Sequence, residues 1–264
     1  MTDLILHESI GPVARLTLNS PDNFNALSMA MITELSATFD RIAQDGQTRV
    51  VILRGAGRAF CAGHDLKEMQ AARQAPDAGA AHFNMLFTTC AQMMQRITTL
   101  PQPVIAEAHG IATAAGCQLV ATCDMGVAAE GTRFGVNGID IGLFCTTPMV
   151  ALTRAIPPKA AFEMLTTGAF IDAQRACELG LINRVVPGAQ LSEATLALAQ
   201  TVAAKLPAAI ALGKQAFHQQ RGLDLAEAYR LATAGMCENA LWPDTAEGTA
   251  AFLEKRRPLW QAPR

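Results

Sequence analysis

The sequence lacks the cysteine pattern of a disulfide-linked or zinc-binding protein. Its 264 residues include seven cysteines, an odd number, and no two of them form a C-x-x-C pair. This spacing favours neither a disulfide framework nor a metal site, so we predict no bound metal. We expect the thiols to be small core residues in a reducing compartment.

The chain also has little charge and no long apolar run. Charged residues make up 17% of it, the net charge is -2, and the basic run at residues 255–257 is short. A nucleic-acid partner usually requires a clustered basic surface, so none is expected. No window reaches the ~18 apolar residues of a membrane span, and residues 1–7 lack a signal-peptide pattern. We therefore expect a soluble protein that begins near Met1, has no membrane partner and lies in the cytoplasm.

Half of the residues are hydrophobic, which is enough to bury one large core. Short apolar runs predict strands at residues 13–18, 50–53, 104–106, 126–129 and 182–186. Helical patterns separate them: Ser28 can cap a helix that Gly46 ends, and apolar residues between positions 83 and 97 share one face of a helix that stops at Pro101. Strands joined by helices pair in parallel, so the class is α/β, either a Rossmann-type sheet or a spiral of β-β-α turns.

The last third of the chain is helical by pattern. Helices are expected to start at four residues, the last of which forms a capping-box pattern with Glu247: Ser192, Pro207, Asp224 and Asp244. We therefore divide the chain into a core of residues 1–198, which holds the site, and a helical region of residues 199–264.

Two turns are candidates for chemistry. In residues 50–69 a buried strand enters a glycine-rich turn, where Ala62 and Gly63 let the backbone approach a ligand and the amide of His64 point outward. In residues 103–124 a strand enters a run of small residues that opens a helix, whose free amides and positive dipole end favour a developing oxyanion. Each turn by itself is also typical of ordinary strand-to-helix packing.

Together, in this order and at this spacing, the two segments resemble the two signature regions of the crotonase, or enoyl-CoA hydratase/isomerase, family. The resemblance extends through residues 134–143, 165–168, 173–183 and 251–256, and residues 110–118 are similar to the enoyl-CoA-hydratase-domain-containing branch. It implies a ClpP/crotonase-like spiral of β-β-α turns with a C-terminal helical trimerisation region. It also implies a homotrimer or dimer of trimers and an acyl-CoA thioester substrate, so coenzyme A is part of the substrate and no separate cofactor is expected.

The resemblance assigns an oxyanion hole to the backbone amides of His64 and Ala115, which would polarise the thioester carbonyl. It places the substrate against further residues of the first turn, of its neighbours and of the last helix: Asn25, Ala26, Leu27, Ala62, Gly63, Asp65, Leu66, Lys67, Gly116, Phe252 and Lys255. In this interpretation the last helix caps the coenzyme A.

The two glutamates with which the family's hydratases add water are absent. Gln118 stands at the position of the first, and Gly138 at the position of the second. An amide can hold water but takes no proton at neutral pH, and glycine offers no side chain. Asp140 is a candidate substitute because it lies two residues beyond Gly138, although a surface or capping role is the more common one for such a residue. Glu107 and His109, before the second turn, are further candidates.

The sequence thus predicts a crotonase-family acyl-CoA enzyme that stabilises a thioester enolate. The alternative is a catalytically weak or inactive acyl-CoA-binding protein that kept the two amides and lost the acid/base pair. A serine-peptidase relative is discounted because residues 114–117 supply no serine.

Overall fold

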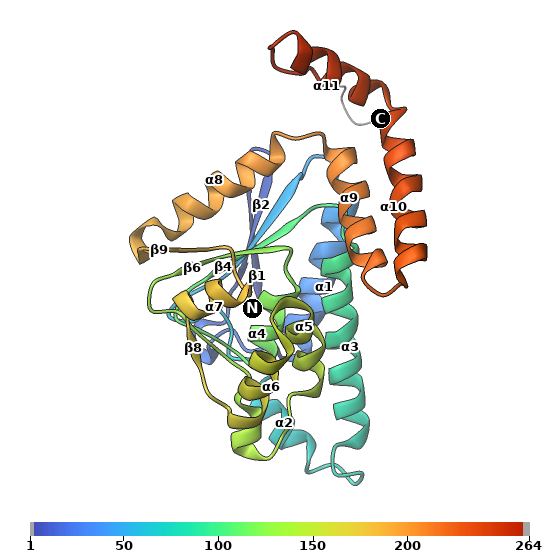
Figure 1. Ribbon diagram of the computed structural model, residues 1–264. Helices are drawn as coiled ribbons and strands as arrows, with labels where there is room; N and C mark the ends of the chain where they lie inside the picture. Colours follow the sequence, from blue (N-terminus) through green and yellow to red (C-terminus); the bar gives the residue numbers. More distant parts are fainter. Residues whose placement is uncertain (1–2, 261–264) are drawn as a thin grey trace.

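The computed structural model describes residues 3–260, which form a six-stranded sheet, a three-stranded sheet and surrounding helices (Figure 1). The strands are β1 Ile5–Ile10, β2 Val13–Leu18, β3 Val50–Gly55, β4 Val104–Ala108, β5 Ile111–Thr113, β6 Met125–Ala129, β7 Arg133–Gly135, β8 Ile171–Asp172 and β9 Arg184–Val186. The helices are α1 Met29–Gln44, α2 Leu66–Ala72, α3 Ala80–Thr99, α4 Ala115–Thr122, α5 Thr146–Ala155, α6 Pro158–Thr167, α7 Ala173–Leu179, α8 Leu191–Ala203, α9 Pro207–Gln220, α10 Leu225–Ala240 and α11 Pro243–Leu253, with 3-10 turns η1 Pro21–Asn23, η2 Asn137–Ile141 and η3 Gly188–Gln190.

The two sheets arise from a chain that winds in repeated turns. The larger sheet has the order β1-β2-β3-β4-β6-β9, with β1 antiparallel to β2 and the other pairs parallel. The smaller sheet has the order β5-β7-β8. Consecutive strands such as β4 and β5, or β6 and β7, therefore enter different sheets before the next helix begins. The predicted α/β spiral of β-β-α turns is confirmed, and the Rossmann-type alternative is excluded.

Both faces of the larger sheet are buried in its central strands, as their near-continuous apolar sequences require, whereas the edge strand β1 is mostly exposed. On one face Val51 and Leu53 of β3 pack in a cluster with residues of α1, α3 and α4. On the other face Val50 and Ile52 pack against α8. Because side chains alternate along a strand, β2, β3, β4 and β6 each contribute to both clusters.

Several predicted helix ends are confirmed. The Ser28 hydroxyl accepts a hydrogen bond from Met31 N–H at 3.2 Å and caps α1, and Gly46 follows this helix with φ +65. Asp224 caps α10 in the same way, and Pro207 is the first residue of α9. These signals are local, so the sequence carries them without reference to the rest of the fold.

Three predicted boundaries need correction. The last helix is capped by Trp242 rather than Asp244, because Pro243 has the fixed φ that suits the first helical position. The α8 helix starts at Leu191, directly after the η3 turn and one residue before Ser192. The division after residue 198 falls within α8, which packs on the sheet along its length up to Ala203.

The C-terminal helices leave the body of the molecule. The α9 helix packs against α3 and α10 against α9, whereas α11 contacts α10 and lies at the opposite end of the view from α2 (Figure 1). No residue of α10 is buried. Large apolar side chains of this region are exposed, and we call them the C-terminal apolar surface: Leu225, Tyr229, Met236, Leu241, Phe252 and Leu253.

Candidate active site

The first predicted turn follows β3 and is tied to the segment before α1. Leu27 N–H donates to Gly63 O at 2.7 Å, and Leu27 forms a parallel bridge with His64. Gly63 has φ +87, and a Cβ at this position would lie 2.9 Å from Ala114 Cβ. Both the left-handed conformation and the lack of space therefore require glycine here.

The second predicted turn joins β5 to α4 and lies directly against the first. Cys61 O accepts a hydrogen bond from Thr113 N–H at 3.0 Å, and a Cβ on Gly116 would lie 2.1 Å from the same oxygen. Ala114 has φ 48 and ψ -119, a conformation that residues with a side chain rarely adopt. The small residues thus allow the backbones of the two turns to lie in direct contact.

The amides of His64 and Ala115 lie at this contact. Ala115 is the first residue of α4, so its N–H is at the positive end of the helix and has no intrahelical acceptor. Within residues 3–260 neither of these N–H groups donates a hydrogen bond. A Cβ on Gly63, the residue before His64, would lie 3.2 Å from Ala115 N, so the two turns meet at these amides.

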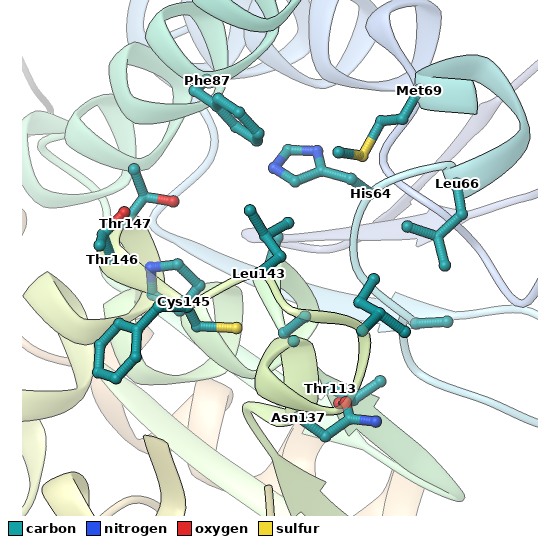
Figure 2. Close-up of a pocket in the computed structure, with 17 residues that line it drawn as sticks. His64, Leu66, Met69, Phe87, Thr113, Asn137, Leu143, Cys145, Thr146 and Thr147 are labelled. Atoms are coloured by element: carbon teal, nitrogen blue, oxygen red, sulfur yellow. The ribbon is translucent and has the colours of Figure 1, made fainter. Parts of the chain in front are cut away.

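A cavity of about 250 Å³ is lined by residues that include His64 and Ala115, and Figure 2 shows His64 among its labelled side chains. Five residues predicted for the site line it: Ala62, His64, Leu66, Ala115 and Gly138. The rest of the wall is mainly apolar and includes Met69 of α2, Phe87 of α3 and Leu143 after η2. Sequence reasoning missed these side chains. Phe87 was visible as part of an apolar helix face, but that pattern does not distinguish a cavity wall from a core.

His64 projects its ring into this region (Figure 2). Its Nδ1 lies 3.2 Å from Leu27 O, whereas its Nε2 is buried and has no hydrogen-bond partner among the described residues. The ring meets Phe87 edge-on, with 5.4 Å between the centroids. Burial lowers the pKa of His64 below the usual 6.5, although the bond to Leu27 opposes the shift. The ring is therefore neutral at neutral pH.

Gln118 and Gly138 occupy different positions relative to the cavity. Gln118 is 5% exposed on α4, its Oε1 has no hydrogen-bond partner in the described chain, and it does not line the cavity. Gly138 lines the cavity, but a Cβ there would lie 2.4 Å from Leu143 O and 2.8 Å from Cys145 Sγ. A glutamate at position 138 would therefore require the backbone to move.

The structure corrects the candidate role of Asp140. This residue is exposed on η2, and its carboxylate lies against Gly168 at the end of α6, where a Cβ would be 2.7 Å from Asp140 Oδ1. It does not line the cavity. The helical turn of η2 directs residues two positions apart to different sides, so closeness to Gly138 in sequence did not place Asp140 in the site.

Glu107 and His109 also lie elsewhere. Glu107 shares the α8 side of β4 with Ile105, and its Oε1 pairs with Arg54 at 3.2 Å. His109 Nε2 lies 2.9 Å from Gly57 O. Neither side chain lines the cavity, because strand alternation and the turn after β4 direct them away.

Other predicted contacts hold the turns in place. The Asn25 amide donates to Ala59 O at 2.8 Å and also to Ala56 O and Phe60 O, while its Oδ1 accepts from Ser20 N–H. Asp65 caps α2 by accepting from the N–H groups of residues 67 and 68. These side chains are engaged within the protein, where they support the turn. Ala26 and Leu27 are buried and belong to the same support.

Lys67, Phe252 and Lys255 do not reach the cavity. Lys67 is exposed on α2 and is absent from the cavity wall. Phe252 is 82% exposed on α11, which lies at the opposite end of the view from α2 (Figure 1), and Lys255 follows this helix with φ 57. Within one chain α10 carries α11 away from the cavity, so the expected capping of the ligand by the last helix stays a prediction about an assembly of several copies.

Neither a metal-type cluster nor a single membrane-length helix occurs in residues 3–260. No group of three His, Cys, Asp or Glu side chains in this part is arranged to hold a metal ion. By length and composition a membrane crossing would require Gly188–Ala203 and Pro207–Gln220 together, and the chain bends by 102° between them.

Known proteins resemble the chain over nearly its whole length. The family described as enoyl-CoA hydratase/isomerase matches residues 8–263. Enoyl-CoA hydratase domain-containing protein 3, mitochondrial, from Xenopus laevis is 43% identical over 94% of this chain and 83% of its own. The crystal structure of an enoyl-CoA hydratase from Mycobacterium smegmatis has a TM-score of 0.94 and 49% identity, covering 98% of this chain and 99% of that one. The human enoyl-CoA hydratase domain-containing protein 3 has a TM-score of 0.92 and 40% identity, covering 98% and 100%.

These relatives contradict one prediction and support another. The vertebrate relatives are named mitochondrial, so the predicted cytoplasmic location is withdrawn. The family match, the relatives above 40% identity and the shared fold agree with the two signature turns. The chain therefore belongs to the enoyl-CoA hydratase/isomerase, or crotonase, family.

Proposed function

We propose that the chain binds an acyl-CoA thioester with the acyl group in the cavity and the carbonyl oxygen between the amides of His64 and Ala115. The observation that carries the proposal is the pair of unpaired amides, which meet beside an apolar cavity. Two such donors stabilise the negative charge of an enolate, and the loss of one costs an enzyme ~10²–10³ in rate. The names of the relatives support the substrate class.

A pair of ligands tests this proposal. Butyryl-CoA and S-butyl-CoA, a thioether, have the same apolar chain, but only butyryl-CoA has a carbonyl oxygen. Isothermal titration should show that butyryl-CoA binds at least ~10-fold more tightly, which corresponds to about 1.4 kcal/mol for the two added hydrogen bonds. Equal affinities, or no binding of butyryl-CoA at millimolar concentration, would refute the proposal.

A second candidate function is binding without turnover. It is favoured by the wall of the cavity, which among the described residues contains no carboxylate, and by Leu143 O, which occupies the space that a side chain at Gly138 would need. Hydration of crotonyl-CoA, measured together with proton exchange into butyryl-CoA, distinguishes the two functions. Turnover well above the buffer rate supports a hydratase, whereas binding without turnover of any thioester supports the second candidate.

We further propose that the chain forms a homotrimer or a dimer of trimers. The C-terminal apolar surface supports this, because large exposed apolar patches mark interaction sites. In such an assembly Phe252 and Lys255 would reach the ligand of a neighbouring copy. Analytical sedimentation of the wild type and of Leu241→Asp measures the oligomeric state. The added charge should dissociate the assembly, and a monomeric wild-type chain would refute the proposal.

A further inference from the structure

The cavity contains one side chain that can accept a proton near neutral pH. Among the described residues of its wall only His64 and Cys145 titrate. Burial raises the pKa of the Cys145 thiol, so it stays protonated. The carboxylates considered from the sequence, on Asp140 and Glu107, lie outside the cavity. Any proton transfer from a bound substrate to a protein side chain therefore points to His64.

The tautomer of His64 follows from its hydrogen bond. Nδ1 faces Leu27 O at 3.2 Å, and a carbonyl oxygen only accepts. In the neutral ring Nδ1 must carry the hydrogen, which leaves Nε2 as a bare acceptor. The position of this carbonyl is itself fixed, because Leu27 is fully buried and its N–H donates to Gly63 O.

The free nitrogen has no partner within the protein. Nε2 is buried and accepts no hydrogen bond from any described residue. The ring is directed towards the space between Phe87 and Leu143, both of which line the cavity (Figure 2). A buried polar atom without a partner is uncommon in a native fold and requires an explanation, of which a catalytic role is one.

We propose that His64 is the proton-transfer residue of this site and that Nε2 removes a proton from the carbon next to the thioester carbonyl. The proposal rests on the proposed function, since the amide of the same residue would hold the carbonyl oxygen. The lone pair of Nε2 bonds to the proton, and the electrons of the broken C–H bond form the carbon–carbon double bond of the enolate. The negative charge moves to the thioester oxygen, where the amides of His64 and Ala115 stabilise it.

Return of the proton to carbon completes the reaction, and the carbon that receives it decides which reaction takes place. The imidazolium gives the proton back to the same carbon or, for a β,γ-unsaturated thioester, to the γ carbon of the dienolate. One base is sufficient for this exchange or double-bond shift, whereas addition of water across a double bond uses a second group. The site is thus suited to proton exchange and isomerisation rather than to hydration.

The surroundings keep the base in its reactive form. No charged side chain from α2, α3, α4, η2 or α5 lines the cavity within the described chain. Burial is the larger influence and lowers the pKa of His64, because charging the ring would require water that the apolar wall excludes. The neutral ring is therefore present at pH 7 and is lost only when the pH falls through this lowered pKa.

Deuterium exchange into butyryl-CoA tests the inference. In His64→Asn the side-chain amide can still donate to Leu27 O and the backbone amide remains, but Nε2 is gone. His109→Gln is the matched control, since its amide can keep the bond to Gly57 O outside the cavity. We expect wild type and His109→Gln to incorporate deuterium at the α carbon, and His64→Asn to bind butyryl-CoA but exchange ~10²–10⁴-fold more slowly.

The pH profile supplies a second measurement that does not depend on a variant. The wild-type exchange rate should decrease as the pH is lowered, with an inflection at an apparent pKa lower than 6.5. The pH profile of His64→Asn should lack this inflection. Unchanged exchange in a folded His64→Asn, or wild-type binding without exchange at any pH, would overturn the inference and leave the proposed function standing. Failure of the wild type to bind the thioester would instead refute the proposed function.

Discussion

Gly63→Ala should damage both stability and thioester binding, because glycine meets two requirements at this position. The φ of +87 costs a residue with a side chain ~1–2 kcal/mol. The added Cβ would lie 2.9 Å from Ala114 Cβ and 3.2 Å from Ala115 N, and such overpacking typically costs a further ~1–3 kcal/mol. We therefore expect a loss of about 2–5 kcal/mol in the free energy of unfolding, concentrated where the two turns meet.

Gly131→Ala provides the matched control. Its φ of +82 is similar, but an added Cβ would meet nothing within 4 Å, so the expected loss is only the ~1–2 kcal/mol of backbone strain. Urea denaturation measures both losses, and isothermal titration with butyryl-CoA measures binding. Gly131→Ala should bind like wild type, whereas Gly63→Ala should bind at least ~10-fold more weakly because the Ala115 amide is displaced. Equal losses of stability, together with unchanged binding by Gly63→Ala, would refute the reasoning.

Three further variants test two buried charged side chains outside the cavity and one glycine in its wall. Lys214 donates to Asp124 Oδ2 at 2.7 Å, so Lys214→Met should lower the free energy of unfolding in urea by ~3–5 kcal/mol; no loss would contradict the buried pair. Burial raises the pKa of Glu107 in the folded state above its usual 4.5. The protonated carboxyl therefore contributes fully to the free energy of unfolding below about pH 4.5, and this contribution is lost as the pH rises through the pKa of the folded state. Wild type should therefore lose stability relative to Glu107→Gln as the pH rises from 4.5, and parallel pH curves would contradict this. Gly138→Ala should lose ~1–3 kcal/mol, because its Cβ would lie 2.4 Å from Leu143 O, and a neutral effect in urea would show that the loop adapts.

Much of the fold was predictable because its signals are local or periodic. The buried strands β2, β3, β4 and β6 appear as short apolar runs, and Ser28 and Asp224 cap helices where they stand in the sequence. Strand β1 and the short strands of the second sheet were missed. Strands of two or three residues are too brief for a period to show, and they form only where the spiral brings their partners alongside.

The site was predictable in its backbone but not in its side chains. The two glycine-rich turns were recognised from their sequence, and they do bring His64 and Ala115 to one cavity. The orientation of Asp140 towards Gly168 depends on the η2 turn, and the engagement of Asn25 depends on carbonyls more than 30 residues away. No period or motif contains such information.

The sequence by itself determined where the two turns of small residues lie. Glycine and alanine residues that allow left-handed conformations and close backbone contacts can be identified one position at a time. Only the tertiary structure decided which side chains face the cavity. It turned the candidate carboxylates away from the cavity, left no room for a side chain at position 138, and placed Leu27 O where it holds the imidazole of His64 with one nitrogen free. These outcomes depend on distances between segments far apart in the chain, which packing alone sets.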